Sequence, residues 1–349
     1  MAMNAQAAPV LDERMTKPRL MDRLIVRPEI GALIGAVVVF LFFSVVTERF
    51  LTAPGVATWL DDSATLGIMA VAVAMLMIGG EFDLSAGVMT ASTALVTAIF
   101  ATSVGLNVWL AMLLSLVFAL TVGAINGMLV MRTGLPSFII TLGMFLALQG
   151  LNLGVTKLVT GTVQVSGIAT ADGYESAGYF LASTINMFGT EFRVSILWWI
   201  AFTAAAAWIL VRSKPGNWIF AVGGSALSAR AVGVPLVRTK IALFMTTAFA
   251  GWLVGNINIL RFTTVQANQG IGLELQFIIG AVIGGCLLTG GFGSAVGAAI
   301  GALIFGMARQ GIVFAGWDSD WFMLFLGVML LAAVLVNNVL RRRAERVRR

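Results

Sequence analysis

The sequence contains no histidine and a single cysteine, Cys286. Metal sites built from histidine and cysteine, catalysis by histidine, and a disulfide within the chain are therefore excluded. No glycine is followed by lysine, so the phosphate-binding loop that ends in Gly-Lys-Ser/Thr is absent as well. If nucleotide hydrolysis drives this protein, the nucleotide must bind to another chain.

Charge is also scarce, at 11% of the residues, whereas hydrophobic residues make up 59%. A soluble domain usually carries roughly 25% charged residues. The mean hydropathy is +0.97. A chain of 349 residues has room for about ten membrane spans of ~20 residues each. The composition therefore predicts an all-α, polytopic helical membrane protein.

Long apolar runs separated by short polar breaks predict ten transmembrane spans. The runs lie at about 31–47, 63–79, 84–103, 108–131, 135–156, 194–211, 241–260, 271–289, 293–314 and 321–340. The predicted organisation is an N-terminal segment (1–30), a transmembrane domain (31–340) and a basic tail (341–349). Two loops, 157–193 and 212–240, are longer than is needed to connect two spans.

The distribution of basic residues predicts the orientation. Of the 22 lysines and arginines, 17 fall in segments that are cytoplasmic if the N-terminus is inside. This asymmetry is the one that the positive-inside rule describes. Both termini are therefore expected in the cytoplasm, and the acidic residues Asp61 and Asp62 outside. The tail directly follows a span, so it is interpreted as an anchor beside anionic lipid, with no nucleic-acid partner.

The stretch IGGEFDLSAG (78–87) interrupts the apolar pattern with two carboxylates, Glu81 and Asp83. A charge in hydrocarbon costs about 2.5–3.5 kcal/mol even on the lenient insertion scale. Gly79 and Gly80 permit a tight or left-handed backbone. Asp83 and Ser85 are candidate caps for the next helix, because their oxygens can accept its free N–H groups. We expect a capped helix break at the cytoplasmic side.

A second break begins with the same letters, IGG, at Gly284 and Gly285. It is expected to face the same side as the first break, and the similarity suggests two related halves, a common plan of transporters. Small residues that follow at helical spacing would bring helices close together: Gly293, Gly297 and Gly301.

The predicted cytoplasmic loop 212–240 contains a helical candidate, SALSARAVGV (225–234). Its small and apolar residues recur at three- and four-residue spacing and form one face: Ala226, Ala229, Val232 and Gly233. Such a face suggests the groove of a partner protein. The alternative is a helix that lies back on the ends of the chain's own spans.

The outer loop 157–193 is a candidate surface for an external partner or a partly ordered surface loop; the residues considered for docking are Asp172, Tyr174, Glu175 and Tyr179. Several polar residues fall within spans, where they line an aqueous pathway or form interhelical hydrogen bonds. They include Asn126, Gln149, Asn152, Asn256 and Arg309.

Three stretches together resemble the permease subunits of ATP-binding-cassette importers for simple sugars, the ribose/xylose type. IGGEFDLSAG is similar to the family signature GG-x-DLS-x-G, with two residues in place of one between Gly80 and Asp83. LPSFIITLGMFLALQGL (135–151) resembles its proline–aromatic TLG segment, and AVGGSALSARAVGVPLVRTKI (221–241) precedes a matching glycine-rich region at 278–304. The stretches follow the family's order over residues from about 60 to 340.

The resemblance implies a permease that translocates a small polyhydroxylated solute, a sugar or polyol, across the inner membrane of a bacterium. It also implies a second permease chain, identical or homologous, a solute-binding protein outside, and a separate ATPase that binds ATP and Mg²⁺. This chain would then carry no cofactor and catalyse no reaction. The implied coupling residues are Ser228, Ala229, Arg230, Val232, Gly233 and Val234; the implied structural breaks beside the pathway are Gly79, Gly80, Asp83, Ser85, Gly284 and Gly285.

Two departures from the family pattern stand out. Many relatives carry acidic residues where this chain has Ser225 to Ser228, and an apolar residue where it has Glu81. The alternative function is a self-sufficient secondary transporter that uses Asp83 and Glu81 as its ion site. The absence of a clear mid-span carboxylate and the large inner loop count against it. A permease for an amino acid or nucleoside is a further possibility within the family.

Overall fold

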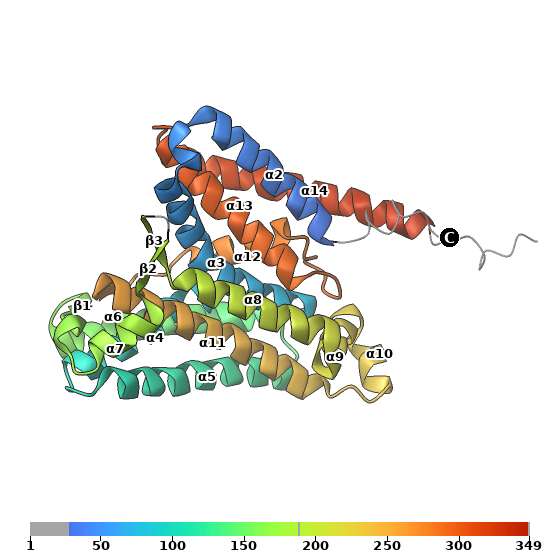
Figure 1. Cartoon of the computed structure of the whole chain (residues 1–349). Helices are drawn as coiled ribbons and strands as arrows, with labels where there is room; N and C mark the ends of the chain where they lie inside the picture. Colours follow the sequence, from blue (N-terminus) through green and yellow to red (C-terminus); the bar gives the residue numbers. More distant parts are fainter. Residues whose placement is uncertain (1–27, 188, 348–349) are drawn as a thin grey trace, which may run out of the picture.

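The computed structural model describes residues 28–187 and 189–347. Most of the predicted N-terminal segment and the last two residues of the basic tail lie outside the described residues. The described chain folds into long helices with a few short strands at one end (Figure 1). The all-α prediction is confirmed in this respect.

A helix occupies each of the ten predicted apolar ranges. Seven of the described helices are long and apolar enough to cross a membrane, two further apolar helices are shorter, and the last contributes the apolar stretch Trp321–Leu335. The ten are α2 (Pro28–Val46), α3 (Ala53–Ile78), α4 (Ala86–Thr102), α5 (Val108–Thr133), α6 (Ser137–Thr160), α8 (Ser195–Arg212), α11 (Leu236–Phe262), α12 (Leu273–Ile283), α13 (Ala295–Phe314) and α14 (Trp321–Val347).

The count of ten spans is not confirmed. α12 has only 11 residues, which gives it a length of about 16 Å, roughly half the hydrocarbon core. The apolar run at 271–289 therefore does not form one continuous helix, because two glycines end α12 at Ile283 and the chain then turns. Apolar composition predicted the position of this helix but not its length.

α3 lies at the centre of the molecule and packs against α8, α11, α12 and α13. Ile68, Met69 and Leu76 on this helix are completely buried. A helix that is apolar all round is expected in such a position. α6, in contrast, leaves most of its apolar side chains exposed, as expected for a surface that faces lipid or another membrane chain.

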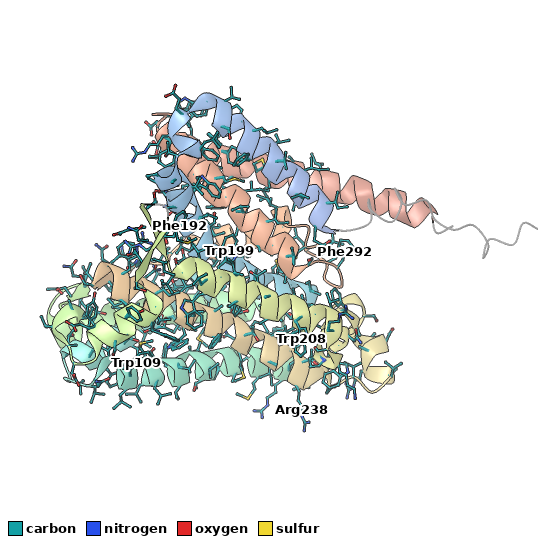
Figure 2. All side chains as sticks on the ribbon, viewed as in Figure 1. Trp109, Phe192, Trp199, Trp208, Arg238 and Phe292 are labelled. Atoms are coloured by element: carbon teal, nitrogen blue, oxygen red, sulfur yellow. The ribbon has the colours of Figure 1, made fainter. Side chains whose placement is uncertain are left out.

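The short elements gather at two opposite ends of the long helices (Figure 1). One end, the α7 end, carries α7 (Tyr174–Leu181), the 3-10 helix η3 (Ile168–Thr170), the antiparallel pair β1 (Gln164–Ser166) with β4 (Thr264–Gln266), and the hairpin β2 (Thr184–Met187) with β3 (Thr190–Arg193). The other, the α10 end, carries α9 (Lys214–Gly224) and α10 (Ala226–Ala231). A further 3-10 helix, η2 (Glu48–Leu51), joins α2 to α3. Figure 2 shows Trp109 and Arg238 at the two ends, and α14 points its C-terminus toward the α10 side.

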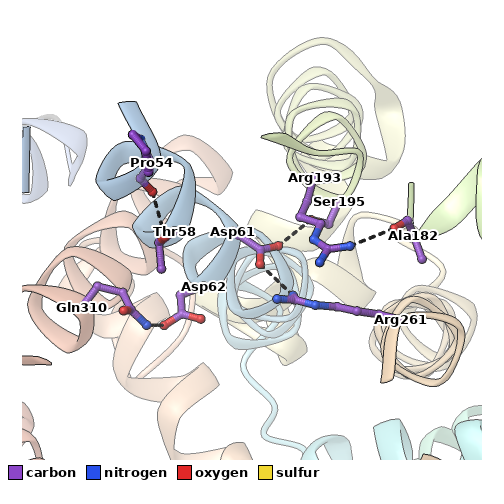
Figure 3. Close-up of polar contacts among 9 residues, drawn as sticks. All are labelled: Pro54, Thr58, Asp61, Asp62, Ala182, Arg193, Ser195, Arg261 and Gln310. Atoms are coloured by element: carbon purple, nitrogen blue, oxygen red, sulfur yellow. Dashed lines mark hydrogen bonds and ion pairs between the residues drawn. The ribbon is translucent and has the colours of Figure 1, made fainter. Parts of the chain in front are cut away.

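Asp61 and Asp62 lie inside α3, which begins at Ala53, ten residues before the predicted run at 63–79. Asp61 is buried and pairs with Arg261 of α11, with 2.7 Å between Oδ2 and Nη1. Ser195 of α8 donates a hydrogen bond to its Oδ1 at 3.0 Å, and the Gln310 amide of α13 donates to Asp62 (Figure 3). These partners on three other helices allow the carboxylates to remain in a helix that starts ten residues before its apolar run.

Glycines allow α12 and α13 to approach closely, as the spacing of small residues predicted. A Cβ atom on Gly297 would lie 2.1 Å from the Gly284 carbonyl oxygen, and one on Gly301 would lie 2.1 Å from that of Gly280. Both neighbours are backbone atoms, so a side chain at either position would force the helices apart.

We predict that Gly301→Ala destabilises the protein by about 1–3 kcal/mol, because the added methyl group meets backbone. The matched control is Gly143→Ala on α6, where a Cβ would have no neighbour within 4 Å. That variant should be neutral or slightly more stable, since alanine favours helix. Thermal unfolding of the detergent-purified variants, followed by tryptophan fluorescence, measures the difference. Equal effects of the two substitutions would contradict the close packing of α12 and α13.

Candidate functional site

α3 ends in a Schellman motif at the first break, residues 79–85, here named the first break loop. Gly80 has a left-handed φ of +82°. Its N–H donates to the Met77 carbonyl at 2.9 Å, and that of Glu81 donates to Leu76 at 3.2 Å. These two bonds satisfy carbonyls that the helix end leaves free. The expected left-handed glycine is therefore Gly80, whereas Gly79 keeps a helical backbone.

α12 ends in the same motif at the second break loop, residues 284–294. Gly285 has a φ of +92°. Its N–H donates to Val282 at 2.9 Å, and that of Cys286 donates to Ala281 at 3.1 Å. The similarity of the two IGG sequences therefore extends to their backbone hydrogen bonds. In this correspondence, Cys286 occupies the position of Glu81.

The two break loops meet each other and α9 at one point. The Gly291 N–H donates to the Ile78 carbonyl at 2.8 Å. A Cβ on Gly223 of α9 would lie 1.7 Å from the same carbonyl oxygen, and one on Gly290 would lie 2.8 Å from the Cα of Gly80. We name this contact of Gly80, Gly223, Gly290 and Gly291 the glycine junction. It lies at the α10 end, so both breaks face one side, as the sequence suggested.

Asp83 organises the polar part of the first break loop. Its Oδ1 accepts hydrogen bonds from the Ser85 N–H at 2.8 Å and from the Ser85 hydroxyl at 2.5 Å. The Asn126 amide of α5 donates to the same hydroxyl at 3.0 Å. Burial raises the pKa of Asp83 to about 6, although the bonds from Ser85 lower it. Ser85 was expected to cap α4 with its side chain, but its hydroxyl makes no such bond because Asp83 binds it.

The rest of this loop is held by residues far away in the sequence. The Phe82 N–H donates to the Ser137 hydroxyl at 3.0 Å, and that of Leu84 donates to Thr141 at 3.0 Å, both on α6. Glu81 forms an ion pair with Lys240 of α11. Sequence reasoning did not identify Lys240 or Ser137 as part of this site. No local pattern could have done so, since Lys240 lies 159 residues from its partner.

α10 forms within the predicted helical stretch 225–234 and is capped by Ser225, whose hydroxyl accepts from the Ser228 N–H at 3.2 Å. Ala229 is 3% exposed and packs inward, so it does not belong to a free apolar face. The exposed apolar side chains are Leu227 at 85% and Val232 at 79%. α10 therefore lies back on the chain and still presents apolar residues outward. The implied coupling residues Ser228, Arg230 and Gly233 are exposed, and Val234 is half-buried; their role stays a prediction.

The predicted intramembrane polar residues have different surroundings. Asn256 is buried and accepts a hydrogen bond from Thr97 at 2.8 Å, an interhelical contact between α11 and α4. Asn152 is buried, and its amide nitrogen has no partner among the described residues. Gln149 is half-buried, and Arg309 is exposed, with its guanidinium 5.9 Å from the Phe322 ring centre. No described group of three or more His, Cys, Asp or Glu residues could hold a metal ion.

Two of the docking candidates in the loop at the α7 end hold it to the helices by side-chain hydrogen bonds. Asp172 accepts a hydrogen bond from the Asn107 amide at 2.8 Å, and the Tyr174 hydroxyl donates to the Leu260 carbonyl at 2.9 Å. These two side chains fix the loop to the helices. Glu175 and Tyr179 are exposed, Tyr179 at 80%. Asp172 is exposed as well, so Tyr174 is the only one of the four docking candidates that is partly buried.

Comparison with known proteins identifies the relatives of this chain. The family model described as "Branched-chain amino acid transport system / permease component" matches residues 55–334. Three relatives come from Escherichia coli (strain K12). They are the ribose import permease protein RbsC (29% identical, covering 88% of this chain and 92% of the relative), the xylose transport system permease protein XylH (29%, 90% and 93%) and the probable ABC transporter permease protein YphD (30%, 92% and 92%). No solved structure matches the chain significantly.

The glycine junction has a built-in reporter, because the only cysteine of the chain lies beside it. Cys286 is 1% exposed. We predict that Gly223→Ala raises the rate at which N-ethylmaleimide alkylates this thiol, since the added methyl group pushes against the Ile78 carbonyl and separates the break loops. The neighbouring Gly224→Ala is the control, because a Cβ there would have no neighbour within 4 Å. Equal labelling of the two variants would show that the junction is not tightly packed.

Proposed function

Since this chain belongs to the family of branched-chain amino acid transport system permease components, we propose that it is the membrane-spanning permease subunit of an ATP-binding-cassette importer. The observation that carries this proposal is its similarity, over about nine-tenths of its length, to permeases named for ribose import and xylose transport. Among the substrates of such importers, we infer a small polyhydroxylated solute, a sugar or polyol. The chain itself catalyses no reaction.

We infer that an ATPase subunit docks at the α10 end. Leu227 on the short helix α10 and Val232 directly after it are exposed apolar side chains, and such residues fit an apolar groove on a partner. We infer that this end faces the cytoplasm, in agreement with the excess of lysine and arginine there. ATP and Mg²⁺ bind to that partner, and closure of two ATPase subunits displaces α10.

We infer that an extracytoplasmic solute-binding protein docks at the α7 end. It carries the strands, α7 and the exposed side chains Glu175 and Tyr179. The solute then passes along the helices to the break loops at the opposite end. A second permease chain, identical or homologous, covers part of the exposed apolar surface of this one, and lipid of the bacterial inner membrane covers the remainder.

The surroundings of the two carboxylates count against an ion-coupled secondary transporter. Glu81 is paired with Lys240, and one oxygen of Asp83 accepts two hydrogen bonds from Ser85. A transport site for a cation needs several oxygen ligands that converge on one point. Here each carboxylate is bound to side chains of its own protein instead.

We predict that Leu227→Arg separates this chain from its ATPase without unfolding it, because the side chain is 85% exposed. The tagged protein is purified from its native membranes in mild detergent, and retained ATPase is identified by mass spectrometry through its Gly-x-x-x-x-Gly-Lys-Ser/Thr peptide. The variant should retain at least about tenfold less ATPase, a loss of ~1.4 kcal/mol in binding.

The matched control is Tyr179→Arg, which is 80% exposed but lies at the opposite end. It should retain the ATPase and its vanadate-sensitive ATP hydrolysis. A wild-type protein that retains no ATPase, but alone accumulates ribose, xylose or leucine in liposomes along an ion gradient, would favour the secondary transporter.

A further inference from the structure

The two helices that flank α10 in the sequence both contact the first break loop. On one side, Gly223 of α9 lies against the Ile78 carbonyl and against Gly80. On the other side, Lys240 in the second turn of α11 forms the ion pair with Glu81. A displacement of α10 therefore reaches this loop from two directions.

The second break loop shows that the turn itself does not need a carboxylate. Cys286 occupies the position of Glu81 in an equivalent Schellman motif, with the same two backbone hydrogen bonds. Its thiol is buried, and a Cβ on Gly293 would lie 2.6 Å from its sulfur. The Glu81 side chain is thus not required for ending α3, and its specific contact is with Lys240.

The ion pair between Glu81 and Lys240 carries a desolvation cost, because both side chains are largely buried. The side chains of Lys240 and Glu81 are only 13% and 9% exposed. Desolvation of a buried ion costs several kcal/mol, and replacement of a buried ion pair by apolar residues is often neutral or stabilising. Stability alone therefore does not account for the pair. Its distinctive property is that it joins two particular atoms on segments 159 residues apart.

The first break loop passes any movement on to the helices that follow it. Its backbone is bound to Ser137 and Thr141 of α6, and its Ser85 hydroxyl is bound to Asn126 of α5. α4 starts directly after it, at Ala86. A shift of Glu81 relative to these hydrogen bonds must move the start of α4 or rearrange its contacts with α5 and α6.

We propose that Glu81 and Lys240 are positioning residues of the transport cycle. Their ion pair transmits the displacement of α10 from α11 to the first break loop, and from there to α4. The glycine junction provides the second connection, through α9. This inference rests on the proposed function, because it requires an ATPase bound at α10.

The experiment uses the permease–ATPase complex in lipid nanodiscs and needs no knowledge of the solute. The rate of Cys286 alkylation by N-ethylmaleimide is measured by mass spectrometry of its peptide, with and without ATP plus vanadate. ATP hydrolysis and retained ATPase are measured on the same samples. The variants are Glu81→Gln, Lys240→Gln and the charge swap that combines Glu81→Lys with Lys240→Glu. Arg238→Gln is the control, an exposed basic residue two positions before Lys240 (Figure 2).

In wild type and in Arg238→Gln, nucleotide should change the alkylation rate by at least about fivefold, the lower range of coupling between two sites. Glu81→Gln and Lys240→Gln should retain the ATPase and hydrolyse ATP, while their alkylation changes by less than about twofold. The charge swap should restore the response, which a loss of local structure alone would not allow.

The proposal is overturned if Glu81→Gln responds to nucleotide as wild type does, if the charge swap fails to restore the response, or if Cys286 in the wild-type complex does not respond at all. In each of these results the ATPase is bound, so the proposed function stands. A wild-type protein that binds no ATPase overturns both proposals.

Discussion

The hydrogen bond from Gly291 to the Ile78 carbonyl is the contact on which the arrangement of the α10 end depends. In a membrane protein, backbone that leaves a helix must find hydrogen-bond partners within the protein. Here the second break loop donates to the last carbonyl of α3, and α9 packs against that carbonyl because Gly223 has no side chain. The position of α9 follows from this packing. The position of α10 follows in turn, because only Ser225 separates the two helices.

The central helix α3 is fixed at both ends by contacts of different kinds. Near its start, Asp61 joins it to Arg261 of α11 and Ser195 of α8. At its other end, the Ile78 carbonyl joins it to the second break loop. Between these points its side chains are packed on all sides. α11 shares both regions, since it contributes Arg261 near one end and Lys240 near the other. These two helices therefore form the part of the fold to which the rest is attached, and the α10 end can move only by rearranging contacts with them.

Several features of the site could be predicted because they depend on neighbouring residues. The breaks at Gly80 and Gly285 follow from glycine pairs that end apolar runs, and the structure places a left-handed glycine in each. The helix at 225–234 follows from its pattern of residues. Its exposed face was predicted less well, because Ala229 packs against the chain and Leu227 faces outward. Small size and apolar character are equally suited to a partner's groove and to the chain's own interior.

The sequence by itself determined the class of the protein, the approximate place of each apolar helix and the two glycine breaks, because hydropathy and backbone freedom are properties of short segments. It also carried the resemblance that the comparisons bear out. Only the tertiary structure decided that α12 is short, that Asp61 lies within α3, and that Glu81 pairs with Lys240. These outcomes depend on which segments meet across the bundle. A charge within a helix or a loop is tolerated where a residue distant in the sequence provides its partner. The local sequence around either residue does not show that the two will come into contact.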